Sequence, residues 1–279
     1  MAKRSGPSVQ SRRLAMTLRR LRKESGVSGV EVAKALGISS SKVSRLETSD
    51  CGVYVDDVEK LLDFYRVPLP LRVELLDVAR RSQQRGLLRM NGSRLPSDWQ
   101  VWIDFEEDAT VLLNYEPLMI PGLLQTPEYA RSIIRETGHE LSPVEVDALV
   151  ASRMARQGLL SQTKPVALDA IVDQSVLERP FGDPAAHRRQ IRHLADVADL
   201  PNISIRMVPT EAGMHSGMNG PFVIIRYADE SNVVFLENKV SSLYLDEEEH
   251  IQVYETTWAE LGKHACSTSK TADYLRSKS

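Results

Sequence analysis

Apolar residues recur at helical spacing through the N-terminal third of this 279-residue chain. Leu14, Leu18 and Leu21 fall every three or four residues and predict a helix over 11–24. Helices are also predicted over 56–65 and 71–81, where the apolar residues keep the same period. The N-terminal part is therefore predicted to be a small all-helical domain.

Between these helices, the stretch from Ser28 to Glu47 predicts two short helices joined by a tight turn. Ser28 and Glu31 have the capping-box spacing that starts a helix. Gly37 can end that helix, because a residue without a side chain readily adopts a left-handed conformation. Ser39, Ser40 and Ser41 offer an N-cap for the second helix. Two helices joined by a short turn with glycine are typical of a helix-turn-helix, whose second helix can enter the DNA major groove.

The rest of the chain mixes helical and alternating patterns. Strands and a helix in the order strand, helix, strand over 166–207 favour a parallel pair with a right-handed crossover. The predicted helices span 97–114, 142–160, 183–198 and 247–261, and a further helix is predicted to start at Pro127 with Thr126 as its cap. The predicted strands span 166–172, 203–207, 222–227, 233–236 and 240–245. The predicted fold class is a five-helix helix-turn-helix domain followed by an α/β domain with a mixed sheet.

The predicted domain boundaries follow from composition. Residues 1–10 are polar and are expected to be a flexible arm, and 11–82 form the helix-turn-helix domain. Residues 83–96 contain Gly, Asn, Ser and Pro without a sustained period and are predicted to be a linker. Residues 97–279 are then the α/β domain, with a regulatory or partner-binding role.

The net charge of −3 hides a strong asymmetry. Residues 1–96 hold 19 Lys and Arg against 10 Asp and Glu, whereas the remainder holds 16 against 28. The basic part coincides with the helix-turn-helix pattern, which directs a polyanionic partner, double-stranded DNA, to that part. An acidic run such as Glu106, Glu107 and Asp108 is expected to be a solvated helix face.

The remaining composition indicates a cytoplasmic protein. No run of eighteen apolar residues exists, and the basic start has no apolar stretch behind it, so we expect neither a membrane span nor a secretory signal. Cys51 and Cys266 are far apart and do not have the spacing of metal ligands, which fits a reduced compartment.

The helix-turn-helix stretch resembles the XRE family of phage-repressor-type regulators over about Leu14 to Val67. The residues that carry the resemblance are Ala33, Gly37, Ile38, Val43, Leu46 and Glu47. The resemblance implies that Arg22 on the first helix pairs with Glu47 at the end of the second helix of the motif. This sequence departs from the family at Gly29, where glutamine is frequent, and at Thr48-Ser49, where Asn-Gly is usual.

The same resemblance assigns the DNA contacts. It implies base contacts from Ser40, Ser41 and Arg45. An arginine can bind guanine O6 and N7 with both arms of its guanidinium group, whereas serine specifies less. Phosphate contacts are predicted for four residues near helix starts, where cations and free amides attract anions: Arg12, Arg13, Ser39 and Lys42. A surface salt bridge is the alternative role for Arg45.

The second half resembles the C-terminal domain of unassigned function found behind XRE heads in actinobacterial antitoxin-like regulators. Its signatures are IPGLLQTPEYA at 120–130, Arg153, RQGLL at 156–160, 174–177 and VPTEAGMHSGMNGPFVII at 208–225. No biochemical activity is attached to that domain, so the resemblance implies no catalytic residues. It does imply a small partner protein encoded nearby.

The chemistry in the second half favours a non-enzymatic role. GMHSGMNGPF at 213–222 lacks the residues that follow a phosphate loop and is predicted to connect strands. His187 and His193 do not share a helix face as metal ligands would, and no nucleophile turn of the G-x-S-x-G kind occurs. We expect no cofactor and no metal.

Three functions stay open at the level of sequence. The first is a homodimeric, sequence-specific DNA-binding regulator, most simply a repressor. The second is an antitoxin-like protein whose main task is to bind and neutralise a small partner. In the third, the C-terminal domain senses a small-molecule ligand near the turn at 120–130.

Overall fold

The computed structural model describes residues 9–48, 54–81, 88–91, 102–103, 105–138, 140–228, 231–239 and 241–279. The chain divides into two compact units. The first comprises Met1–Asp104, Asp229–Val233 and Asn238–Ile251, and the second comprises Phe105–Ala228, Val234–Glu237 and Gln252–Ser279. The first unit therefore includes short segments from late in the chain as well as the N-terminal helices.

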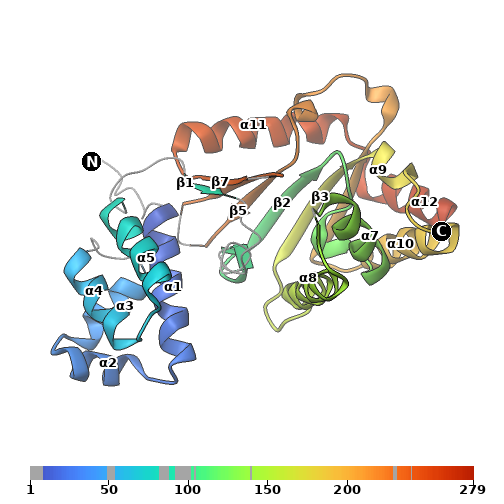
Figure 1. The fold of residues 1–279 in the computed structure, drawn as a ribbon. Coiled ribbons are helices and arrows are strands. Elements are labelled where there is room, and N and C mark those ends of the chain that lie inside the picture. Colours follow the sequence, from blue (N-terminus) through green and yellow to red (C-terminus); the bar gives the residue numbers. More distant parts are fainter. Residues whose placement is uncertain are drawn as a thin grey trace. The chain divides into compact units, whose positions relative to one another are not determined.

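Five predicted helices of the N-terminal part are confirmed and gather into one bundle (Figure 1). They are α1 (Val9–Glu24), α2 (Gly29–Leu36), α3 (Ser40–Glu47), α4 (Val55–Phe64) and α5 (Leu69–Arg81). Helix α1 starts two residues earlier than the sequence predicts, so Val9 and Gln10 of the predicted arm are helical, and the rest of that arm lies outside the described residues. The backbone N–H of Val9 donates to the carboxylate of Asp246, which compensates the free donors at the helix start.

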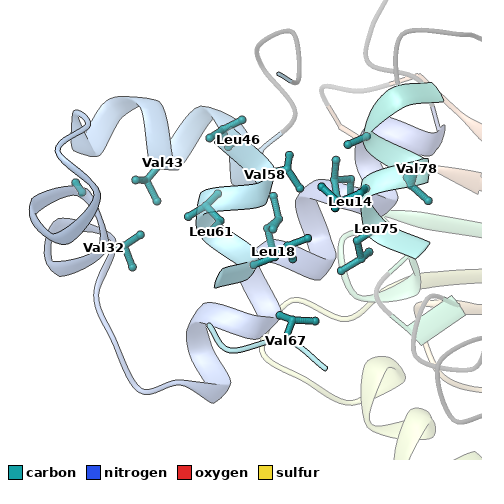
Figure 2. Packing of buried hydrophobic residues seen from close by; sticks show 14 residues of the cluster. Leu14, Leu18, Val32, Val43, Leu46, Val58, Leu61, Val67, Leu75 and Val78 are labelled. Atoms are coloured by element: carbon teal, nitrogen blue, oxygen red, sulfur yellow. The ribbon is translucent and has the colours of Figure 1, made fainter. Parts of the chain in front are cut away.

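An apolar cluster holds the helical bundle together, as Figure 2 shows. Leu14 and Leu18 of α1 contribute to it, as do Val43 and Leu46 of α3. Other members come from α2, α4 and α5, among them Val32, Ala33, Val58, Leu61, Leu62, Leu75 and Val78. Burial of these side chains fixes the orientation of α3, since its apolar face must point inward.

Residues around the predicted linker differ from the sequence prediction. Within 83–96, residues Leu88–Asn91 form strand β1, which pairs antiparallel with β7 (Ser241–Leu245) in the first unit. The helix predicted over 97–114 is wrong at its end, because Val111–Glu116 form strand β2. A short apolar run fits a helix or a buried strand equally well, and pairing with distant strands decides between them.

The second unit is built on a mixed sheet with the strand order β6-β5-β2-β3-β4. The remaining strands are β3 (Ala167–Asp173), β4 (Ile203–Val208), β5 (Phe222–Arg226) and most of β6 (Val233–Asn238). β3 pairs parallel with β4, as the strand, helix, strand pattern predicts, and also parallel with β2. β2 pairs antiparallel with β5. This confirms an α/β domain with a mixed sheet.

Helices and turns connect these strands, and several of the helices start at a side-chain cap. Thr126, Ser142 and Asp183 cap α7 (Pro127–Thr137), α8 (Pro143–Arg156) and α10 (Pro184–Val197). Further elements are η1 (Gly122–Leu124), η2 (Gln157–Leu160), α9 (Gln174–Glu178), η3 (Thr210–Ala212), η4 (Ser216–Asn219), α11 (Glu248–His264) and α12 (Thr268–Lys278). The segment at 213–222 connects β4 to β5, as predicted.

Helix α12 has no counterpart among the predicted elements. It is held by long-range contacts, because the hydroxyl of the fully buried Thr271 accepts the backbone N–H of Met207 at 3.1 Å. The N–H of Cys266 donates to the carbonyl of Met207 at 2.8 Å. These bonds attach the end of the chain to β4.

Candidate functional site

Helices α2 and α3 form a tight helix-turn-helix. Glu31 N–H donates to Ser28 Oγ at 3.2 Å, and Ser28 N–H donates to the Glu31 carboxylate at 2.7 Å, which completes the predicted capping box. Gly37 adopts a left-handed conformation with φ 66° and donates its N–H to Ala33 O. Ile38 then packs against the apolar cluster, which holds the turn against the helical bundle.

Helix α3 has one buried and one exposed face. Val43 and Leu46 are buried in the cluster, whereas Ser40, Ser41 and Arg45 are exposed. Arg45 forms no ion pair with another residue in the described part of the chain. The alternative of a surface salt bridge therefore finds no partner there. A helix with exposed hydroxyls and a guanidinium on one face can offer donors to base edges.

The predicted ion pair between Arg22 and Glu47 is present. Arg22 Nε donates to Glu47 Oε1 at 2.7 Å and Nη2 donates to Oε2 at 2.9 Å, a bidentate arrangement. This hydrogen-bonded carboxylate raises the pKa of Arg22. The pair joins α1 to the end of α3, and Arg22 also donates to Val27 O before α2. One arginine thus connects the three helices around the motif.

Two predicted phosphate-contacting arginines are placed differently from the expectation. Arg12 is 3% exposed and donates to the backbone carbonyl of Ser231, and Arg13 is 7% exposed and pairs with Glu74 of α5. Both guanidinium groups are directed into the first unit, so neither is offered to a phosphate in this structure. Their partners are 61 or more residues away in sequence, and no local pattern shows them.

The other two predicted phosphate contacts lie at the start of α3. The hydroxyl of Ser39 is exposed and caps the helix by accepting the N–H of Lys42 at 3.1 Å. The ammonium group of Lys42 pairs with Asp57 on α4 at 2.8 Å. Lys42 therefore already has an anionic partner within the protein, through a contact between two helices that no local sequence pattern predicts.

In the second unit, the signature residues of the C-terminal resemblance meet in one buried polar network. Gln125 Oε1 accepts from Arg153 at 2.9 Å, and its Nε2 donates to Ile120 O at 2.7 Å. Gln157 Nε2 donates to the carbonyl of Gln125 at 2.7 Å. Gln190, which is fully buried, donates to Leu124 O and accepts from the N–H of Thr126. The polar groups of the turn at 120–130 are thus largely bonded to the protein itself.

The expected solvated acidic face is wrong for Glu106. Glu106 is 1% exposed and forms a bidentate pair with Arg156, with distances of 2.6 and 2.7 Å. Glu107 and Asp108 are exposed, as expected. Arg156 belongs to the RQGLL signature, so this signature arginine compensates a buried carboxylate rather than facing a ligand.

A cavity of about 410 Å³ lies between α7 and α8. Its lining combines the arginines Arg131 and Arg135 with Leu141, Pro143 and Val146. Arg131 already pairs with Asp147. The cavity is therefore separate from the 120–130 network.

The carboxylate of Glu116 in the second unit has a raised pKa. The pKa of Glu116, the last residue of β2, is raised to about 8, because removal of its carboxylate from water and the nearby carboxylate of Glu237 outweigh the opposing charge of Arg153. Burial and the positive charge of Arg156 lower the pKa of Arg153. Glu116 is thus expected to be largely protonated at neutral pH.

Glu116→Gln is expected to remove part of the pH dependence of stability. The folded pKa is raised from an ordinary value of 4.5, so the stabilisation by Glu116 is full below that value and is lost as the pH rises through about 8. The free energy of unfolding of the wild type should fall by up to about 1.4 kcal/mol per pH unit relative to the variant over this window. Urea unfolding at pH 5, 6, 7 and 8 measures this, and parallel curves for the two proteins would contradict the raised pKa of Glu116.

Both parts of the chain match models of known protein families. Residues 99–277 match the family model of a domain of unknown function, DUF5753. The chain belongs to this family. Upstream of the DUF5753 domain, residues 13–75 match the family model of a helix-turn-helix domain. That second match contains α2 and α3 and supports DNA binding by the N-terminal helices.

Other comparisons add little to the DUF5753 assignment. No curated protein matches the chain. Among solved structures, the archaeal chromatin protein TrmBL2, whose structure shows a novel mode of DNA binding, is 11% identical over 82% of this chain and 71% of its own, with a TM-score of 0.33. A score that low does not bear on fold or function.

The described residues were also compared with the requirements of a membrane-spanning helix and of a metal site. Within them, no helix is long and apolar enough to cross a membrane. Nor do three or more His, Cys, Asp or Glu side chains of the described ranges come together as a metal site.

Proposed function

We propose that this DUF5753 protein is a sequence-specific DNA-binding transcription regulator of the XRE type, and most simply a repressor. The helix-turn-helix reads DNA, and the DUF5753 domain receives a protein or ligand signal. The observation that carries this proposal is the exposed face of α3, where Ser40, Ser41 and Arg45 point away from a buried apolar face. The positive balance of residues 1–96 supports it, since it attracts the phosphate backbone.

In this function, the residues of the motif have separate tasks. Arg45 binds a guanine in the major groove through both arms of its guanidinium group, and Ser40 and Ser41 contact neighbouring bases or phosphates. Arg22 and Glu47 hold α3 against α1, so that the reading face is fixed before DNA binds. Gly29 has no side chain to offer to DNA. A Cβ built at this position would lie 3.8 Å from Cγ1 of Val43, which is an ordinary van der Waals contact. Specificity therefore depends on few side chains, and DNA shape and dimer spacing must contribute.

We also propose a homodimer, because one short helix contacts too few base pairs to be selective alone. Selection from a random pool of duplexes with the full-length chain tests both ideas. We expect enrichment of sites with two related half-sites whose centres lie about 34 Å apart, and weaker binding as salt rises. A pool that shows no enrichment over its input would contradict sequence-specific binding. Enrichment of single half-sites would contradict the dimer alone.

A second candidate function is neutralisation of a small partner protein, with DNA binding as secondary autoregulation. The acidic balance of residues 97–279 favours this antitoxin-like role, because it suits a basic partner. The two candidates differ in what Arg45→Ala should do, since partner binding would survive a change on α3. In both, we propose a non-enzymatic protein that acts in the cytoplasm.

A further inference from the structure

The contact between Lys42 and Asp57 affects the affinity of α3 for DNA of any sequence. Lys42 lies in the first turn of α3, where the sequence predicts a phosphate contact. Its ammonium group lies 2.8 Å from Asp57 Oδ1 in the first turn of α4. The pair is electrically neutral as a whole. It therefore contributes little to the attraction of the DNA backbone.

The two partners are not equally free to move. The side chain of Lys42 is 35% exposed and ends in an ammonium on a flexible stem, whereas the side chain of Asp57 is only 10% exposed. Asp57 is also stabilised where it is, because the start of a helix favours a carboxylate. If Lys42 moved to a phosphate, it would leave a mostly buried carboxylate without its cation. That loss offsets much of the gain from the new contact.

From this geometry we infer that Asp57 is a specificity-determining residue, which holds Lys42 and thereby keeps α3 from binding DNA of every sequence. The inference rests on the proposed function of α3. Affinity that does not depend on sequence is reduced, while Arg45 stays free to contact bases. The ratio between specific and non-specific binding rises as a consequence, because the chain loses only the sequence-independent contribution.

Four variants of the full-length chain separate this inference from a general effect of charge. Asp57→Asn keeps the shape of the side chain and releases Lys42. Asp57→Asn combined with Lys42→Met removes both charges of the pair. Lys42→Met alone removes only the ammonium group. Asp56→Asn is the matched control, because it removes the same charge from an exposed neighbour in the same turn of α4.

The measurement is binding of each variant to a duplex without an operator, followed by fluorescence anisotropy between 50 and 200 mM salt, about the range over which phosphate contacts change affinity strongly. Asp57→Asn should bind about five- to tenfold more tightly at 0.1 M salt, with a slope of log affinity against log salt that is steeper by about 0.9. The double variant and Lys42→Met should stay within about twofold of the wild type. Asp56→Asn should bind more tightly by a smaller factor and without the steeper slope.

Each other result has a definite meaning. An Asp57→Asn variant that binds like the wild type overturns the inference, and so does an equal gain in the double variant, because the gain would then not pass through Lys42. A loss of about eightfold in Lys42→Met also overturns it, even if Asp57→Asn fails to fold, since Lys42 would then already bind phosphate in the wild type. A wild type that binds no DNA at any salt concentration removes the proposed function as well, which distinguishes the two failures.

Discussion

Replacing Glu106 with alanine is expected to lower the free energy of unfolding of the second unit by about 3–5 kcal/mol. The carboxylate of Glu106 is 1% exposed and makes two short contacts with Arg156, whose side chain is 9% exposed. Without Glu106, the guanidinium group of Arg156 stays among buried neighbours and loses its bidentate acceptor. Breaking one side of a buried pair costs far more than the pair contributes when both partners are present.

Two further variants test this reason. Glu107→Ala removes the same charge from the next, exposed residue and should change stability by less than about 0.5 kcal/mol. Glu106→Leu combined with Arg156→Met removes both charges and should restore much of the loss, since no uncompensated ion remains. Hydrogen exchange of the amides of β2 and β3 reports the stability of the second unit by itself. Equal protection in Glu106→Ala and Glu107→Ala would show that the Glu106–Arg156 contact does not stabilise this unit.

The helix-turn-helix could be predicted in detail because its determinants are local. The capping box of Ser28 and Glu31, the left-handed Gly37 and the cap at Ser39 each act within four residues. The pairing of Arg22 with Glu47 spans 25 residues and followed from resemblance to a family, not from the pattern itself. Local chemistry and family likeness together were sufficient for this motif.

Long-range contacts account for what the sequence did not show. Val111 and Leu112 read as the end of a helix, but β2 pairs with β3 and β5, which follow it by more than 50 residues. The acidic run at 106–108 gives no sign that Glu106 alone is buried by Arg156, 50 residues later. Helix α12 depends on contacts to β4.

In the candidate site, too, local features could be predicted from the sequence and long-range contacts could not. The exposed face of α3 follows from the helical period, which places Val43 and Leu46 inward and Arg45 outward. The availability of each cation does not follow from the period, because partners decide it. Arg13 is bound to Glu74 and Lys42 to Asp57, both through tertiary contacts. A count of basic residues therefore overestimates the number that can contact phosphate.

Arg45→Ala is expected to weaken binding to the selected operator by about 1–3 kcal/mol, or roughly 5- to 150-fold, because a bidentate contact to guanine is lost. The side chain is exposed, so the fold should not change. Arg45→Lys is the matched variant, since lysine keeps the charge but lacks the planar fork that fits O6 and N7 together. Arg135→Ala, an exposed arginine on α7 of the second unit, controls for the loss of one positive charge.

The most direct test of DNA reading by α3 is the ratio of the Kd on a non-specific duplex to the Kd on the operator, measured at one salt concentration for the wild type, Arg45→Ala and Arg45→Lys. We expect this ratio to fall by roughly 5- to 150-fold in both variants, while the non-specific Kd of Arg45→Lys stays within about twofold of the wild type. Arg135→Ala should keep the wild-type ratio. A ratio that is the same in the wild type and both Arg45 variants would contradict the assignment of Arg45 and α3 as the reader of the DNA sequence.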